Sequence, residues 1–179
     1  MFSLFRMMPT QHPSLAPTKV IFLDFDGVIR IPVPGGGPRI EAEFCAERMK
    51  RVVRLAETSG ARIVISSDWR LRHDRVAVEK LLSPRIPAPL LHGDWRTPLL
   101  VPGESGSDES ERVPRGSEIV AWLASHPEID AFAILDDAPS RQFPSLSDQL
   151  VRCTLLDGFT AECFEAALKA LGASESATA

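Results

Sequence analysis

Short apolar runs alternate along the chain with longer segments of helical periodicity. Apolar residues fill positions 20–23 and 131–135, and all of 61–65 except Arg62. Runs of this length, bounded by turn residues or small polar residues, are typical of strands buried in a parallel sheet. We predict two further strands at 87–91 and 150–156.

The segments between these runs have apolar residues spaced three or four positions apart, which predicts amphipathic helices. The first predicted helix spans 40–59 and ends at Gly60, because glycine readily adopts the left-handed conformation that ends helices. A second is predicted from about Asp68 to Leu82. A third begins near Arg115, with Ser117 as its N-cap, and Thr160 caps a last helix.

Strands that alternate with helices predict an α/β protein, a three-layer, doubly wound, Rossmann-like parallel sheet. We expect a single domain over 18–172, a flexible arm over 1–17 and a disordered tail over 173–179. Residues 102–112 are polar and acidic, which predicts a mobile loop. The proline- and glycine-rich stretch 31–38 is read as a loop, either a flap near the first strand end or a plain connector.

Composition narrows the class of protein only a little. The formal net charge of −4 argues weakly against a non-specific coat on nucleic acid. Cys45, Cys153 and Cys163 are odd in number and lack metal-ligand spacing, which indicates reduced thiols and a cytoplasmic location. No apolar run is long enough to span a membrane, so we expect no membrane partner. The sequence does not indicate an oligomeric state.

Candidate chemistry is concentrated where three of the predicted strands end. Asp24 and Asp26 follow the first strand, Ser66 and Ser67 the second, and Asp136 and Asp137 the fourth; Arg115 begins a helix. All strand ends of a parallel sheet face one edge, so these side chains can converge. Four carboxylates together repel one another unless a cation lies between them, and oxygen ligands of this kind suit Mg²⁺.

This ordered set resembles the haloacid-dehalogenase-like (HAD) superfamily, most of whose members are Mg²⁺-dependent phosphohydrolases. The matching residues are Asp24-Phe-Asp-Gly-Val28, Ser66, Arg115 and Asp136-Asp137. Their order and spacing agree with the family over about residues 19–171.

The resemblance implies a role for each matching residue. Asp24 would be the nucleophile that forms an aspartyl-phosphate, and Asp26 would be the general acid and then the general base. Ser66 and Arg115 would neutralise the phosphoryl oxygens. Many relatives carry lysine in place of Arg115, and Arg112 is a rival for this role.

The resemblance also implies the remaining site residues. Mg²⁺ would be held by the Asp24 side chain, the Asp26 backbone carbonyl, Asp136 and Asp137. Further contacts to substrate are expected from Gly27, Ser67 and Arg70.

The gaps between the motifs are too short for a folded cap domain, and in this superfamily an open site accompanies macromolecular phosphates. We therefore expect a phosphorylated substrate that is a polynucleotide end or a phosphoprotein. The stretches 66–70, 92–98 and 115–123 also look like a capless HAD branch found beside RNA-repair enzymes. Trp69 and Trp95 would suit stacking on bases, although aromatic residues are more often anchors in a core or loop.

Other interpretations remain open on the sequence alone. The chain is either the phosphatase just described, a silent phosphate- or protein-binding module on the same scaffold, or a signalling receiver with a phosphorylated aspartate. Ser66 is either a phosphate ligand or a helix cap, and Arg115 is either a site residue or a solvated surface cation. The four histidines lack ligand spacing and receive no role: His12, His73, His92 and His126.

Overall fold

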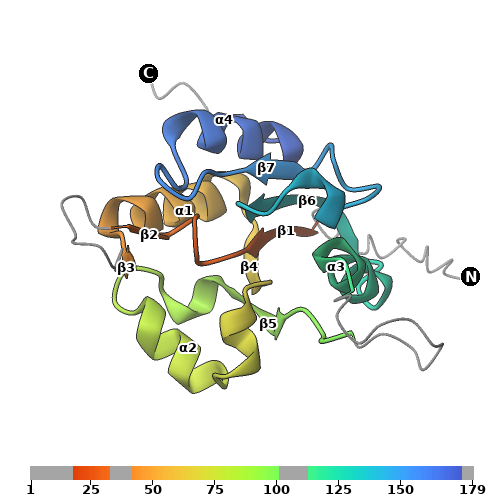
Figure 1. The fold of residues 1–179 in the computed structure, drawn as a ribbon. Coiled ribbons are helices and arrows are strands. Elements are labelled where there is room, and N and C mark those ends of the chain that lie inside the picture. Colours follow the sequence, from red (N-terminus) through yellow and green to blue (C-terminus); the bar gives the residue numbers. More distant parts are fainter. Residues whose placement is uncertain (1–17, 33–41, 101–112, 175–179) are drawn as a thin grey trace, which may run out of the picture.

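The structure, a computed structural model, describes residues 18–32, 42–100 and 113–174 (Figure 1). The arm predicted for 1–17 and the loop predicted for 102–112 lie outside these ranges. So do most of the loop read at 31–38 and residues 175–179 of the predicted tail.

A five-stranded sheet with the order β5-β4-β1-β6-β7 forms the centre of the fold. All of its neighbouring strands pair in parallel, which confirms the predicted α/β fold class. Its strands are β1 (Thr18–Leu23), β4 (Arg62–Ile65), β5 (Leu91–Arg96), β6 (Ile129–Asp136) and β7 (Leu150–Arg152).

Strand β1 shows how the sheet separates two apolar layers. Its side chains alternate, so Ile21 and Leu23 pack on one face while Val20 and Phe22 pack on the other. The first face is covered by α1 (Ala46–Ser59), α2 (Arg75–Leu82) and α4 (Ala161–Ala170), and the second by α3 (Arg115–Ala124). Helices on both faces account for the fully buried apolar residues of this central strand, Val20–Leu23 (Figure 1).

Two predicted helix signals are confirmed and one is wrong. Gly60 ends α1 with a left-handed φ of 72°. The hydroxyl of Thr160 accepts a hydrogen bond from the Cys163 amide at 3.3 Å at the start of α4. Ser117 is not an N-cap, because α3 already begins at Arg115, with Pro114 in the N-cap position.

The start of α1 and the path before α2 differ from prediction. Strands β2 (Arg30–Pro32) and β3 (Ala42–Phe44) form a separate antiparallel pair, so α1 begins only at Ala46. The helix predicted from Asp68 is interrupted: a short 3₁₀-helix, η1 (Asp68–Leu71), precedes α2. Asp74 explains the break, because its side chain accepts from the Ala77 amide at 2.8 Å and so starts a new helix.

The two edge strands of the sheet, β5 and β7, have other bounds than the sequence predicts. The third strand of the chain order lies at Leu91–Arg96 and not at 87–91, because Ala88–Leu90 is a 3₁₀ turn. Half of the residues of β5 are polar or charged (His92, Asp94 and Arg96), as an edge strand allows, and this composition concealed the strand. Strand β7 ends at Arg152 and not at 156.

The described residues contain no folded cap domain over the sheet edge. The chain from Asp26 to Ser66 forms β2, β3, α1 and β4, and the described part between Ser66 and Arg115 forms η1, α2, a 3₁₀ turn and β5. Among the described helices, none is both long and apolar enough to cross a membrane.

Candidate active site

Three strands of the sheet end side by side and bring the predicted residues together. Leu23 pairs with Ile65 of β4 and with Leu135 of β6. The Asp24 amide donates to the Leu135 carbonyl at 3.0 Å, and the Ser66 amide donates to the Leu23 carbonyl at 3.0 Å. The backbone ladder therefore fixes the places where the side chains following each strand begin.

Asp24, Asp136 and Asp137 form what we call the acidic cluster. One carboxylate oxygen of each lies within 4.8 Å of those of the other two. Asp24 and Asp136 are 3% and 0% exposed, and Asp137 is half-buried. Because buried carboxylates are costly without a cation, this arrangement is suited to holding a metal ion.

Two buried oxygen atoms beside the cluster also indicate a missing partner. Oδ1 of Asp136 accepts from the Ala138 amide at 2.9 Å, but Oδ2 has no hydrogen-bond partner within the described ranges. The Ser66 hydroxyl is likewise buried and unpartnered there. An oxygen without a partner in a buried site can accept a ligand or, for the hydroxyl, donate to one.

Arg115 supplies the cation of the site from the first turn of α3. Its Nη2 lies 3.0 Å from Oδ1 of Asp24 and donates to the Ser66 carbonyl at 3.0 Å. Its Nε lies 3.4 Å from Oδ2 of Asp136. Arg115 is therefore no solvated surface cation, whereas its rival Arg112 lies outside the described residues.

The close approach of α3 places this guanidinium. At Gly116, a Cβ atom would lie 2.9 Å from the Cα of Phe143 and 3.0 Å from the Gln142 carbonyl. Only glycine therefore lets the helix start come so near to the chain that follows β6. The Arg115 amide also lies 3.4 Å from the side-chain oxygen of Gln142.

Burial and like charge perturb the acids of the cluster. Burial, and then the charge of Asp24, raises the pKa of Asp136 to about 7. The same two causes raise the pKa of Asp137. Burial alone would lower the pKa of Arg115, but the carboxylates of Asp24 and Asp136 raise it. The cluster therefore places three carboxylates beside one guanidinium, and the single positive charge does not balance them.

Gly27 forms the turn behind the cluster. Its φ is 72°, which side-chain-bearing residues rarely adopt. A Cβ atom at this position would lie 2.4 Å from Oδ2 of Asp137. The glycine thus leaves room for an acid, and its predicted contact to substrate stays a prediction.

The side chain of Asp26 points to a different set of partners. Its Oδ1 accepts from Nη1 of Arg30 at 2.5 Å, and its Oδ2 accepts from the indole Nε1 of Trp69 at 2.9 Å. Asp26 and Trp69, with His73, also line a hollow of about 280 Å³. The side chain is thus absent from the acidic cluster, and its expected contact to metal through the backbone carbonyl stays a prediction.

Arg70 lies beneath the site and does not face it, which corrects the expected contact to substrate. It is 1% exposed, and its guanidinium donates to the carbonyls of Ser66, Ser67 and Thr97 at 2.8–3.0 Å. It also pairs with Glu118 at 2.5 Å. Burial lowers the pKa of Arg70, although Glu118 opposes this. With its donors engaged, Arg70 holds the turn after β4 in place.

The serines and tryptophans are also placed by the structure. Ser67, 1% exposed, occupies the N-cap position of η1, but its side chain makes no capping hydrogen bond. Ser66 precedes that position and does not cap the helix. Trp69 and Trp95 are partly buried against the core, so the structure favours anchors over exposed stacking platforms.

Sequence reasoning missed Arg30 and Glu118. Glu118 is 8% exposed and lies on the buried stripe of α3 beside Ile119. An acid within an apolar stripe was the available signal, since a buried charge requires a partner. Arg30 gave no such signal, because its pairing with Asp26 depends on the turn at Gly27.

A second hollow lies beside Arg115. Its volume is about 350 Å³, and Arg115, Glu118 and Asp68 are among its lining residues. Asp68 lines both this hollow and the one beside Asp26. The surface around the acidic cluster thus offers two neighbouring depressions.

Comparison with known proteins adds one family. A family model described as the HAD domain in Swiss Army Knife RNA repair proteins matches residues 20–164. Searches of curated proteins and of solved structures gave no match. The matched range contains every strand end described above, and the chain therefore belongs to this family of HAD-type hydrolase domains.

Proposed function

We propose that the protein is a Mg²⁺-dependent phosphomonoester hydrolase that acts through Asp24. The observation that carries this proposal is the buried Asp24 carboxylate, with Arg115 at 3.0 Å on one side and two further acids on the other. A carboxylate that is already ionised can attack phosphorus without a base. Phosphoryl transfer requires that the phosphate is positioned and its negative charge neutralised, and the neighbouring arginine and acids are suited to this.

The donor set of the acidic cluster suits Mg²⁺. All three side chains offer carboxylate oxygens, which hard divalent cations prefer. Among the described residues, Oδ2 of Asp136 makes no hydrogen bond, and only its ion pair with Arg115 competes with a metal ion for it. Asp24, Asp136 and Asp137 would hold the ion, and when bound it would offset the negative charge of the phosphoryl oxygens.

In the first step, an oxygen of Asp24 attacks the phosphorus and the bond from phosphorus to the leaving oxygen breaks. Asp26 gives a proton to that oxygen, so the product leaves as an alcohol. Arg115 and the unpartnered Ser66 hydroxyl donate to the phosphoryl oxygens. An aspartyl-phosphate remains on Asp24.

In the second step, water attacks the phosphorus while Asp26 takes a proton from it. The bond between phosphorus and the Asp24 oxygen breaks, which restores the carboxylate and releases inorganic phosphate. Both carboxylate oxygens of Asp26 are engaged by Arg30 and Trp69. Each of these oxygens keeps a second lone pair, so Asp26 can exchange a proton while both contacts are kept.

The open edge of the sheet supports a macromolecular substrate. Within the described ranges no folded cap covers the acidic cluster, so a phosphate at the end of a large molecule could reach it. The family description refers to RNA repair proteins, and we therefore propose a polynucleotide end as the substrate. A phosphoprotein is the alternative substrate, and the experiment must distinguish it from a polynucleotide end.

The proposal is tested by phosphate release from a panel of substrates with Mg²⁺ and with EDTA. The panel holds an aryl phosphate, a phosphopeptide, a mononucleotide, and RNA and DNA with 5′- or 3′-phosphate ends. We expect Mg²⁺-dependent release from a polynucleotide end, well above release from the mononucleotide. Preference for the phosphopeptide would overturn the substrate class, and no release from any member would favour a silent binding module.

A further inference from the structure

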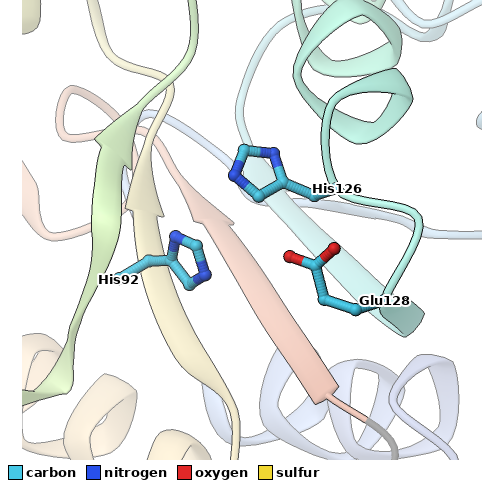
Figure 2. Close-up of side chains that lie close together, drawn as sticks. All are labelled: His92, His126 and Glu128. Carbon is cyan, nitrogen blue, oxygen red and sulfur yellow. The ribbon is translucent and has the colours of Figure 1, made fainter.

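A second set of metal-ligating side chains lies at the opposite edge of the sheet. His92 is near the start of β5, His126 follows the end of α3, and Glu128 directly precedes β6. The starts of parallel strands share one edge, so these residues lie away from the edge that carries Asp24. Figure 2 shows the three side chains directed toward one another in front of the sheet.

The geometry of this histidine cluster, defined as His92, His126 and Glu128, suits one ion. Each residue offers a nitrogen or oxygen atom, and the three atoms lie within 4.8 Å of one another. Both histidines are half-buried and Glu128 is exposed, so an ion can enter from solvent. The three residues are far apart or unevenly spaced in the sequence, which is why ligand spacing did not reveal them.

The hydrogen bond of the His126 ring leaves its Nε2 for an ion. Nδ1 of His126 lies 2.8 Å from the Trp122 carbonyl. A carbonyl only accepts, so Nδ1 carries the proton and Nε2 of the neutral ring has the lone pair. Nδ1 of His92 lies 3.2 Å from the Asp94 carbonyl and 3.1 Å from the Asp94 amide. Donation to the carbonyl, the usual arrangement at metal sites, leaves the lone pair on Nε2, whereas acceptance from the amide leaves Nε2 protonated. An ion at Nε2 of His92 therefore selects the first tautomer.

A carboxylate also faces the His126 lone pair. Nε2 of His126 lies 3.6 Å from Oδ2 of Asp94, too far for a hydrogen bond. Asp94 does not join the three residues whose ligand atoms lie within 4.8 Å of one another. It is therefore a competing partner for His126 and not a fourth ligand.

Trp122 holds both rings in position. It is 2% exposed and stacks on His126, with ring centroids 3.7 Å apart and planes 12° from parallel. Its edge-to-face contact with His92 has a centroid distance of 5.0 Å. The ligands are thus oriented by the core before any ion binds, which lowers the entropic cost of binding.

We propose that His92, His126 and Glu128 bind a divalent ion of the zinc type at a site separate from the acidic cluster. Two imidazoles and one carboxylate are a known zinc donor set, whereas Mg²⁺ prefers oxygen ligands. Bound zinc would tie the start of edge strand β5 to the turn between α3 and β6. It would stabilise the fold by binding only the folded chain.

The test measures zinc binding and does not use phosphate release, so it is independent of the proposed function. Metal-free protein is dialysed against Zn²⁺ in excess Mg²⁺, which keeps the acidic cluster occupied, and bound zinc is determined by mass spectrometry. We expect a single zinc ion per chain and a higher melting temperature. Absence of bound zinc would overturn the proposal. It would also be overturned if the wild type bound zinc and Asp136→Asn did not, because the zinc would then lie in the acidic cluster.

Variants of the ligands make the test specific. We expect Glu128→Gln and His126→Gln to weaken zinc binding by at least about tenfold, while His73→Gln, a histidine outside the cluster, binds as wild type. Glu128 is exposed, so its variant does not depend on repacking of the core. Co²⁺ in place of zinc should give the visible absorption of a tetrahedral site in the wild type alone. Unchanged affinity in Glu128→Gln and His126→Gln would contradict the assignment and leave only an ion pair between His126 and Asp94.

Discussion

The two clusters at opposite edges of the sheet differ in both burial and chemistry. The acidic cluster uses oxygen atoms alone, buries Asp24 and Asp136, and already contains a protein cation in Arg115. The histidine cluster mixes nitrogen with oxygen, is half-exposed, and is oriented by Trp122. The first arrangement suits the proposed phosphate chemistry, and the second suits the proposed binding of a divalent ion.

Asp24→Asn should have the largest effect on the acidic side. We expect phosphate release to fall by at least roughly a thousandfold, because the nucleophile is removed. Asparagine is close in size, so circular dichroism should show an intact fold. Asp148→Asn, at an exposed position, is the matched control and should retain activity. Retained turnover in Asp24→Asn would show that the acidic cluster works in another way.

Arg115→Met comes next in expected effect. The guanidinium contacts Asp24 and Asp136 and would donate to the phosphoryl group. We expect kcat to fall by about 10²–10³-fold, the usual cost of losing one such donor. Arg115→Lys should fall between this variant and the wild type, because the charge stays while the planar, two-pronged contact is lost. Equal activity of Arg115→Met and wild type would show that the arginine only fills space.

Much of the acidic cluster follows from the sequence, because carboxylates that directly follow apolar strands of a parallel sheet lie at the same edge. The ladder around Leu23 enforces that meeting. The histidine cluster could not be found in this way. Its residues lie beside strand starts and after a helix, and the packing of both histidine rings on Trp122 appears only in the folded chain. The fold was predictable at its apolar centre and less so at its polar edge strand β5, where hydrophobic pattern is weak.

Arg70 marks another limit of sequence reasoning. Its neighbours Ser66 and Ser67 belong to the predicted site, so a contact with substrate was the natural expectation. The structure instead turns the side chain inward to Glu118, 48 positions away in the sequence. Local sequence does not indicate the direction of a long side chain when its partner lies on another element.

Glu118→Gln tests this support beneath the acidic cluster. Removing the nearer acid leaves only Asp68 of the described acids, at 3.7 Å, beside the buried Arg70 charge. Loss of a buried ion-pair partner typically costs about 3–5 kcal/mol, a large part of the stability of a small domain. We expect a lower denaturation midpoint in urea. Glu165→Gln, at an exposed position of α4, is the control and should change stability little. A midpoint equal to wild type in Glu118→Gln would mean that Arg70 finds another partner.

A gradual change in stability, of no more than about 1.4 kcal/mol per pH unit, is expected from the protonation of Asp136. Its folded pKa of about 7 lies above the ordinary value of 3.8. The folded chain therefore binds the proton more tightly, and this stabilisation is complete below about pH 4. It is lost as the pH rises toward 7. Urea unfolding of the metal-free protein across this range should show stability falling with pH.

Two controls connect that pH response to the acidic cluster. Asp136→Asn cannot titrate at this position, so its stability should vary less with pH. Mg²⁺ competes with the proton for the same oxygens, so its addition should stabilise the protein most near pH 7. The same slope in Asp136→Asn and wild type would assign the response to another group.

The most direct test of the central claim is chemical trapping on Asp24. Protein that is turning over a phosphorylated substrate is quenched in acid and treated with borohydride, which reduces an aspartyl-phosphate to homoserine. Peptide mass spectrometry then locates the modified residue. The account predicts homoserine at position 24, only when substrate and Mg²⁺ are both present. Turnover with no modified residue, or with homoserine at another aspartate, would contradict it.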